Sequence, residues 1–372
     1  MTEKGLADVV AAETRLSDID GKLGRLFYVG YDIHDLATWS TFEDIVYLLQ
    51  YQRLPNRTEL EELNERLVGE RELDEFTRDL MPTFGEVASP MSMLRTSVSA
   101  SSGYDPDGWD NGPEANERKA LRMIARFPTL ITTYHRMRTG QEPVAPNPKL
   151  PHAANFLYML TGEEPEEEAA RAFDICLVLH ADHTMNASTF AARVVASTLS
   201  DMHSAITAAI AALKGPLHGG ANEAVMKMLE EIGDVERVDE DITGRLGRKD
   251  KIMGFGHRVY KTEDPRATHL RRLSRELGER AGDTRWFELS ERIEKIVMNE
   301  KGLYPNVDFY AASVYRYLGI PTDLFTPVFA ASRVSGWTAH VQEQHNDNRL
   351  IRPESDYIGP RNQTYVPIEE RS

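Results

Sequence analysis

Four short segments concentrate the residues of this chain that could do chemistry, and the first contains two histidines. His180 and His183 are separated by Ala181-Asp182 near the end of a predicted helix. Two imidazoles at this spacing can chelate a metal ion, and histidine equally serves substrate binding or packing. Asp182 could orient a ring or cap the next helix. The segment alone leaves structural, substrate-binding and metal-binding interpretations open.

The second segment places a histidine at the start of a helix. His218 is followed by Gly219-Gly220 and then by a helical pattern over 221–232. The positive end of a helix dipole disfavours a protonated imidazole, and a neutral one can donate a hydrogen bond to a developing oxyanion. The glycines let a ligand approach the backbone. We interpret His218 as functional rather than as an ordinary loop histidine.

The third segment, Lys251–Lys261 followed by Asp264-Pro265-Arg266, is basic and contains Gly254-Phe255-Gly256-His257. Between Arg245 and Arg272 there are nine Lys or Arg and three Asp or Glu. A run of charge usually marks a solvated helix face, but a cationic island with glycines in an acidic chain fits a polyphosphate ligand. We favour phosphate binding, although no P-loop or complete dinucleotide fingerprint is present.

The fourth segment carries a carboxylate in the first turn of a predicted helix. Asn306 has the side chain of an N-cap, which places Asp308 in that turn. The helix dipole stabilises an ionised carboxylate there, so capping alone accounts for Asp308. A permanently ionised carboxylate that faces a cleft could equally be a base, and both interpretations stay open.

Hydrophobic periodicity predicts a mainly α fold with one small N-terminal β-hairpin. Residues 14–31 alternate around an Asp20-Gly21 turn. Thr41 and Thr58 each precede a helical pattern, and Thr58 with Glu61 has the spacing of a capping box. Further helices are predicted over 90–100, 117–138, 152–162, 165–181, 188–199, 203–213, 221–232, 266–281, 285–299, 308–318 and 327–344.

Helix breakers predict two domains. Lys214-Gly215-Pro216 and Gly319-Ile320-Pro321 bracket about one hundred residues, a usual domain size. We expect a large helical domain made of 1–218 and 319–372 and a smaller helical domain made of 219–318, with hinges at the two breaks. The last twenty residues are rich in proline, which predicts a disordered tail or an arm that lies on a partner.

Composition excludes several classes of function. Hydrophobic residues are 41% and charged residues 27% of the chain, as in globular proteins. A formal net charge of −16 opposes binding to nucleic acid or to an anionic membrane. Cys176, the only cysteine, is expected to be a buried, inert thiol. The N-terminus lacks a targeting pattern and no apolar run could span a bilayer, so we expect a cytoplasmic protein.

Taken together, the segments closely resemble citrate synthase over nearly the whole chain, from Gly30 to Pro353. The short length resembles the archaeal and Gram-positive dimeric form, and the acidic, arginine-rich composition suggests a halophilic archaeon. The motifs that carry the resemblance are His-Ala-Asp-His at 180–183, Gly-Pro-Leu-His-Gly-Gly-Ala-Asn at 215–222, Gly-Phe-Gly-His-Arg-Val-Tyr at 254–260, Pro-Asn-Val-Asp-Phe at 305–309, Ser332–Trp337 and Leu350–Pro353.

The resemblance implies condensation of acetyl-CoA with oxaloacetate, followed by hydrolysis of citryl-CoA to citrate and CoA. It implies that Asp308 removes a methyl proton from acetyl-CoA, that His218 stabilises the enol, and that His257 acts as an acid on the oxaloacetate carbonyl. It also implies no metal and no permanently bound cofactor, since CoA and acetyl-CoA take part as product and substrate.

Binding residues and assembly are implied in the same way. Oxaloacetate would be held by His183, Arg266, Arg333 and Arg352, with Arg352 coming from the neighbouring subunit of a homodimer that shares its active sites. The residues implied to hold CoA are Lys251, Ile252, Met253, Gly254, Phe255, Gly256 and Lys261.

Three alternatives remain. A 2-methylcitrate synthase would use the same residues with propionyl-CoA, and the extra methylene is worth only ~1–3 kcal/mol in an apolar pocket. A metal-dependent hydrolase would use His180, Asp182 and His183. A non-catalytic helical dimer would bind a CoA-type ligand without turning it over.

Overall fold

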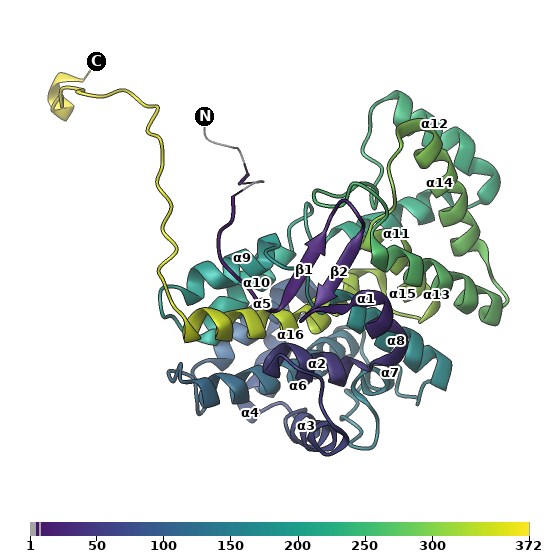
Figure 1. Cartoon of the computed structure of the whole chain (residues 1–372), viewed down its shortest axis with the longest axis horizontal. Coiled ribbons are helices and arrows are strands. Elements are labelled where there is room, and N and C mark those ends of the chain that lie inside the picture. The colour runs from purple at the N-terminus through teal and green to yellow at the C-terminus, as the bar shows by residue number, and fades with distance from the viewer. Residues whose placement is uncertain (1–4, 7–8, 372) are drawn as a thin grey trace.

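The computed structural model describes residues 5–6 and 9–371, and it confirms a mainly helical protein with one small sheet (Figure 1). The strands are β1 Ser17–Asp20, β2 Arg25–Tyr28 and β3 Tyr31–Asp32. The helices are α1 Ile33–Trp39, α2 Phe42–Tyr51, α3 Arg57–Gly69, α4 Glu75–Leu80, α5 Pro90–Ser101, α6 Pro113–Arg138, α7 His152–Thr161, α8 Glu167–His180, α9 Ala187–Ala196, α10 Met202–Leu213, α11 Ala221–Ile232, α12 Val238–Gly247, α13 Pro265–Ala281, α14 Arg285–Lys301, α15 Val307–Tyr317 and α16 Phe325–Asn346.

The predicted hairpin is present, and a third strand extends it. β1 pairs with β2 in antiparallel register, from Ser17 opposite Tyr28 to Asp20 opposite Arg25. β3 then pairs with β2, which makes a three-stranded sheet in the order β1-β2-β3. β3 has two residues, too short for its alternation to be recognised in the sequence.

Side-chain caps fix where several helices begin. Asn56, not Thr58, caps α3: its side chain accepts from the Glu59 backbone N–H, and Glu59 accepts from the Asn56 N–H at 2.8 Å. The capping box expected at Thr58 and Glu61 was therefore wrong by two residues, because Asn is at least as good a cap as Thr. The cap expected at Asn306 is confirmed, since its side chain accepts from the Asp308 N–H.

Three helices were missed by the periodicity. α1 follows β3 directly and α4 has six residues, so neither offers enough turns to reveal an apolar face. α12 follows directly after a 3-10 turn at Val235–Arg237, and no side chain caps its N-terminus, so the sequence has no capping signal for the start of this helix. All the helices that the sequence did predict are present, and most of them begin and end within two residues of the expected positions.

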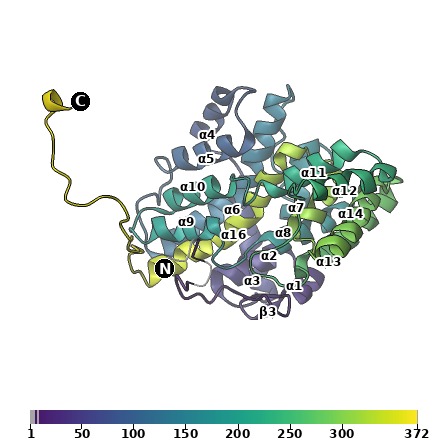
Figure 2. The same ribbon diagram turned by 90° about the horizontal axis from the view of Figure 1, so that it is seen from above.

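The helices gather in two groups, which Figure 1 and Figure 2 show from two directions. Helices α11 to α15 lie together on one side, and the remaining helices and the sheet make up the rest of the body. α16 crosses this larger group in contact with α2, α6, α8, α9 and α10. Its residues are buried on every face from Phe325 to Val341, so polar residues on it reach the interior.

The chain after α16 leaves the body as an extended and almost fully exposed tail, drawn in yellow in Figure 1. A 3-10 turn at Ile368–Glu370 is the last element described. Among the residues described, no helix is long and apolar enough to cross a membrane. The first residues of the chain, on which the expected lack of a targeting signal depends, lie partly outside the described ranges.

The net charge of −16 leads to a prediction about salt. At neutral pH we expect the midpoint of thermal unfolding to rise by several degrees between dilute buffer and molar potassium chloride, because salt screens the self-repulsion of the folded chain. Differential scanning calorimetry measures this midpoint at each salt concentration. Near the isoelectric point of about 5.2 the same salt series should have far less effect, and an equal response at both pH values would contradict the prediction.

Candidate active site

Two of the chemically interesting segments are joined by backbone pairing. Phe255 and Pro305 form an isolated β-bridge, the Gly256 N–H donates to the Tyr304 carbonyl at 2.9 Å, and the Asn306 N–H donates to the Gly254 carbonyl at 2.9 Å. Gly254 has φ +82°, and a Cβ there would stand 2.9 Å from the Cβ of Phe309. Only glycine allows this close approach. The pairing brings the loop of His257 beside the first turn of α15.

His257 is fixed in one tautomer. Its Nδ1 accepts the backbone N–H groups of Val259 at 3.0 Å and Tyr260 at 3.2 Å. A nitrogen that accepts two N–H groups carries no proton, so the proton lies on Nε2. Burial and the neighbouring Arg266 lower the pKa of His257 to about 4. At neutral pH this side chain is therefore an uncharged hydrogen-bond donor through Nε2.

His183 and Tyr260 complete a group of rings with His257. His183 Nε2 lies 3.2 Å from the Tyr260 hydroxyl, and the rings of His183 and His257 are edge to face with centroids 5.3 Å apart. Burial, and then the charge of Arg266, hold the pKa of His183 well below its usual range. His183 is thus a second neutral imidazole at the same place.

Two guanidinium groups lie buried beside these rings. Arg266 Nε and Nη2 donate to the two oxygens of Asp264 at 2.9 and 2.7 Å. Arg333, on α16, donates from Nε to the His180 carbonyl at 2.6 Å, and its guanidinium carbon lies 4.7 Å from the centroid of the Phe329 ring. Burial lowers the pKa of Arg333 to about 10, which leaves it charged at neutral pH. Buried positive charge of this kind suits an anionic ligand.

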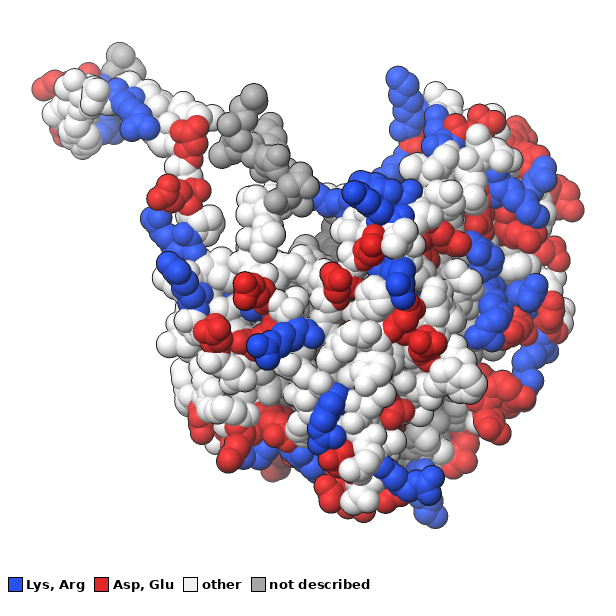
Figure 3. Space-filling view, in the orientation of Figure 1, with Lys and Arg blue, Asp and Glu red and all other residues white. Residues whose placement is uncertain are grey.

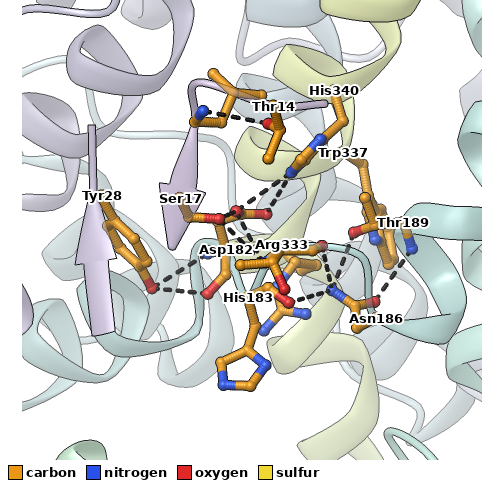
Figure 4. Close-up of polar contacts among 12 residues, drawn as sticks. Thr14, Ser17, Tyr28, Asp182, His183, Asn186, Thr189, Arg333, Trp337 and His340 are labelled. Carbon is orange, nitrogen blue, oxygen red and sulfur yellow. Dashed lines mark hydrogen bonds and ion pairs between the residues drawn. The ribbon is translucent and has the colours of Figure 1, made fainter. Parts of the chain in front are cut away.

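His218 is held by the start of α9. Its Nε2 lies 2.8 Å from Ser188 Oγ, which also accepts the indole N–H of Trp337 at 3.0 Å. The Ser188 hydroxyl donates to Asn186 Oδ1 at 2.7 Å, an oxygen that also accepts two backbone N–H groups. Asn186 and Trp337 are labelled in Figure 4. Burial and Arg333 lower the pKa of His218 to about 4, so this imidazole too is neutral.

The protonation of the Asp308 side chain differs from what the helix dipole alone suggested. Its backbone N–H donates to Asn306 Oδ1 at 3.0 Å, but the side-chain Oδ1 is buried and has no hydrogen-bond partner among the residues described. Burial raises the pKa of Asp308 to about 7, although Arg266 and Arg333 act in the opposite direction. The expectation of a permanently ionised carboxylate was therefore wrong, because desolvation outweighs the dipole. A free carboxylate with a pKa near neutrality is suited to proton transfer.

Arg352 is the one oxaloacetate candidate that lies apart from the others. The backbone N–H of Ile351, the residue before it, donates to Ser197 Oγ at 3.1 Å, beyond the C-terminal end of α9. Ser188 lies in the first turn of that helix, which spans about 15 Å from end to end. Arg352 itself is exposed. Within one chain, it does not join the residues around His183.

Among the residues expected to hold CoA, Met253 and Gly256 are half-buried and Gly254 is buried, and the other four fall into two sets. Ile252 and Phe255 are 6% and 8% exposed and belong to the hydrophobic core, so their backbone rather than their side chains would face a ligand. Lys251 and Lys261 are exposed, and the Lys261 N–H donates to the Gly21 carbonyl in the turn of the hairpin. Figure 3 shows Lys and Arg side chains along the upper edge of this face, near that turn, in an otherwise mixed surface.

The geometry does not favour the metal-dependent alternative. His180 Nδ1 lies 2.7 Å from the Cys176 carbonyl, whereas the carboxylate of Asp182 contacts Ser17 and His340. These groups point to different partners rather than to a common centre. Over the described part of the chain, no three His, Cys, Asp or Glu side chains are grouped as metal ligands. Cys176 is buried, as expected, and burial raises the pKa of its thiol.

Sequence reasoning gave no role to several residues that shape the site. Ser188 and Trp337 lie inside quoted segments, yet their contact joins positions 149 residues apart. Tyr260 follows His257 by three residues, and Asp264 precedes Arg266 by two. The nearby basic residue was the one sequence signal that could have indicated a role for Asp264. A hydroxyl or an indole N–H carries no charge pattern, so the sequence held no comparable signal for Ser188, Tyr260 and Trp337.

The arrangement has the parts needed to form a carbanion next to a carbonyl: a carboxylate with a raised pKa, neutral imidazole donors and buried guanidinium groups. This is an enzyme site within a mainly helical fold. The family model described as "Citrate synthase, C-terminal domain" matches residues 5–354. The chain therefore belongs to the citrate synthase family, and it is a transferase.

Individual relatives agree with this assignment over almost the full length. Citrate synthase 2 of Bacillus subtilis is 53% identical over 99% of each chain, and citrate synthase of Haloferax volcanii is 50% identical over 99% of each chain. The solved structure of the ternary complex of carboxymethyl coenzyme A and oxaloacetate with citrate synthase from Thermoplasma acidophilum has a TM-score of 0.94, at 35% identity, and covers 100% of both chains. The halophilic archaeal origin expected from composition is not supported, since the bacterial relative is more similar than the Haloferax one.

The raised pKa of Asp308 predicts a pH-dependent stability. From the unfolded pKa of about 4 to the folded pKa of about 7, the native state binds more protons than the unfolded state, so ionisation costs stability as pH rises through this window. Asp308→Asn removes the cost. We expect its thermal midpoint to exceed that of the original chain by several degrees at about pH 8 and to match it at about pH 4.

Thermal unfolding followed by circular dichroism at both pH values makes the measurement. Asp234→Asn, at an exposed aspartate without a side-chain cap hydrogen bond, is the matched control and should show no such difference. A midpoint for Asp308→Asn at about pH 8 that is no higher than that of the original chain would contradict the assignment.

Proposed function

We propose that this chain condenses acetyl-CoA with oxaloacetate and water to give citrate and CoA. The observation that carries the proposal is the unpartnered, buried Oδ1 of Asp308, whose pKa is raised to about 7. A base of this kind can take a proton from carbon only if the negative charge that develops on oxygen is stabilised at the same time. Neutral His218 and His257 supply the donors that this chemistry requires.

In the first step, Asp308 Oδ1 takes a proton from the methyl group of acetyl-CoA, and the electron pair moves to the thioester oxygen. His218 donates to that oxygen from Nδ1. For this, the Ser188 hydroxyl turns its proton from Asn186 Oδ1 to His218 Nε2. A neutral imidazole can polarise a carbonyl oxygen in this way.

In the second step, the enolate carbon attacks the ketone carbon of oxaloacetate, the π electrons of the ketone move to its oxygen, and that oxygen receives a proton. His257 Nε2, which carries its proton by the tautomer described above, is the donor. His183 and the guanidinium groups of Arg266 and Arg333 hold the substrate's carboxylates, since a planar fork matches a carboxylate better than an ammonium group does. Water then cleaves the citryl thioester: its hydroxide adds to the thioester carbon, its proton returns to the His257 ring, and the CoA sulfur leaves with the proton that Asp308 took from the methyl group.

The reaction must exclude water until the carbon–carbon bond has formed. We propose that residues 219–318 form a small domain that carries CoA on 251–256 and Lys261. This domain would close on the large domain, 1–218 with 319–372. The hinges would lie at 214–219 and 318–321, where the two groups of helices are joined.

We further propose a cytoplasmic homodimer in which Arg352 binds oxaloacetate in the partner's site. The position of Arg352, beyond the far end of α9 and away from His183 in its own chain, supports this assignment. The exposed tail that follows it would lie on the partner.

The second candidate substrate is propionyl-CoA. Relatives at 45% and 40% identity are the citrate/2-methylcitrate synthase of Bacillus subtilis and the 2-methylcitrate synthase of Shewanella oneidensis. One methylene changes binding by only ~1–3 kcal/mol, so both acyl-CoA substrates are compared in the assay below.

A thiol-release assay with oxaloacetate tests the proposal. We expect rapid CoA release that requires oxaloacetate and is faster with acetyl-CoA than with propionyl-CoA. Asp308→Asn should lower kcat by about a hundred- to ten-thousandfold, the usual effect of removing a general base. In the original chain, kcat should rise with pH through about 7 as Asp308 ionises, whereas the histidines are neutral throughout that range.

Asp234→Asn is again the control and should retain full activity. A preference for propionyl-CoA would assign the chain as a 2-methylcitrate synthase with the same site. CoA release that persists in Asp308→Asn, or that does not need oxaloacetate, would refute the proposed reaction.

Mixing two inactive variants tests the shared site. Arg352→Gln and Asp308→Asn chains, unfolded together and refolded, should regain about a quarter of full activity, because half of the dimers are mixed and each mixed dimer holds one complete site. The measurement is the same CoA release. Refolding each variant alone is the control. No recovery in the mixture, with dimers shown by light scattering, would mean that Arg352 acts within its own chain, and an Arg352→Gln chain that is active alone would mean that Arg352 has no role.

A further inference from the structure

The carboxylate next to His183 is completely buried and is held from two sides of the fold. Asp182 Oδ2 accepts a short hydrogen bond from the Ser17 hydroxyl of β1 and a second one, at 3.3 Å, from His340 Nε2 of α16 (Figure 4). Asp182 belongs to residues 181–186, the His183 loop, which connects α8 to α9. Elements far apart in sequence thus meet at this loop.

The sheet holds the backbone of the His183 loop on both sides of the histidine. Ser17 Oγ accepts the Thr184 N–H at 3.0 Å in addition to donating to Asp182. One hydroxyl is thus hydrogen-bonded to the residue before His183 and to the residue after it. Thr184 has φ +48°, a left-handed conformation that a β-branched residue rarely adopts unless its surroundings impose it. The Tyr28 hydroxyl donates to the Asp182 carbonyl at 2.9 Å and accepts the Asp182 N–H at 3.2 Å.

Helix α16 packs against the same loop from the opposite side. A Cβ on Gly336 would stand 2.4 Å from the Ala181 carbonyl oxygen and 2.6 Å from Asp182 Oδ1, a contact that any larger residue would break. Arg333, one turn earlier, donates to the His180 carbonyl. The loop is therefore confined between β1, β2 and α16.

His340 has a defined donor for Asp182. Arg193 Nη1 lies 3.3 Å from His340 Nδ1, and a guanidinium has only donors, so Nδ1 accepts and Nε2 carries the proton toward Asp182. Arg193 is itself paired with Glu343 at 2.6 Å. In a buried site, directed donors of this kind hold a carboxylate more firmly than they would in water.

We propose that Ser17 and His340, acting through Asp182, are positioning residues that fix the His183 imidazole for oxaloacetate. His183 itself has little else to orient it: across the residues described, its side chain makes one hydrogen bond, at 3.2 Å, to Tyr260. The inference rests on the proposed function, in which His183 binds oxaloacetate. It assigns a role in substrate binding to the small N-terminal sheet.

Ser17→Ala tests the inference, because it removes one hydroxyl and leaves a small side chain in the strand. We expect the KM for oxaloacetate to rise by about tenfold or more, since a small displacement of a binding group has effects of this size or larger, while the KM for acetyl-CoA stays within about twofold. Ser17→Thr keeps the hydroxyl and should restore most of the affinity for oxaloacetate.

Ser290→Ala is the matched control. Ser290 is a fully buried serine whose hydroxyl donates to the Trp286 carbonyl at 2.7 Å within α14, a helix that packs against α12, α13 and α15. It should leave both KM values unchanged. Ser17→Ala with an unchanged KM for oxaloacetate, or with both KM values raised equally, would overturn the proposal.

A second pair of variants decides the point if Ser17→Ala does not fold. His340→Gln retains a donor toward Asp182 and should bind oxaloacetate nearly as the original chain does. His340→Leu removes the donor and should raise the KM for oxaloacetate selectively. Equal KM values in these two variants would overturn the proposal.

Failure of the proposed function is distinguishable from failure of this inference. An original chain that releases no CoA would refute the function, and the variants would then be compared by hydrogen exchange of the peptide covering residues 181–186. We expect exchange of this peptide to rise in Ser17→Ala and not in Ser290→Ala. Equal protection in both would show that Ser17 does not hold the loop.

Discussion

Burial of two guanidinium groups governs the chemistry of the candidate site. Arg266 keeps its charge against Asp264, whereas Arg333 lies on the ring of Phe329 and donates to a backbone carbonyl. Removing such charges from water is costly, and the cost is repaid where an anion completes the site. The loss of water, and then the charge of these arginines, lower the pKa values of the nearby histidines and keep them neutral. The loss of water also raises the pKa of Asp308, although the arginines act in the opposite direction. Neutral donors and a ready base thus both result from the exclusion of water from the site.

The sequence predicted the parts of the site that local chemistry marks. Glycines beside His218, an N-cap before Asp308 and a basic run around His257 are recognisable because each depends on near neighbours in the chain. The same holds for the helices, whose apolar faces recur over several turns, and for the hairpin, whose Asp20-Gly21 signal marks the start of the turn over residues 21–24. Short elements such as α4 and β3 were not predicted, because a few residues do not establish a hydrophobic period.

What the sequence could not predict depends on contacts between distant segments. The Ser17 hydroxyl meets Asp182 across 165 residues, and His340 reaches the same carboxylate across 158. No local pattern distinguishes these residues from other serines and histidines. The protonation of Asp308 was misjudged for a related reason: a helix dipole is visible in the sequence, but the depth of burial that opposes it emerges only when α15 packs.

The acidic surface and the positive site coexist because charge acts differently in water and in the interior. On the surface, arginines pair with acids, as in Arg53 with Glu59 and Arg280 with Glu166, and solvent screens what remains. That exterior repels an anion only within about 8 Å at physiological ionic strength. Inside, Arg333 acts without this screening. A net charge of −16 therefore opposes extended polyanions that must lie along the surface, but it does not oppose a small anion that enters the site.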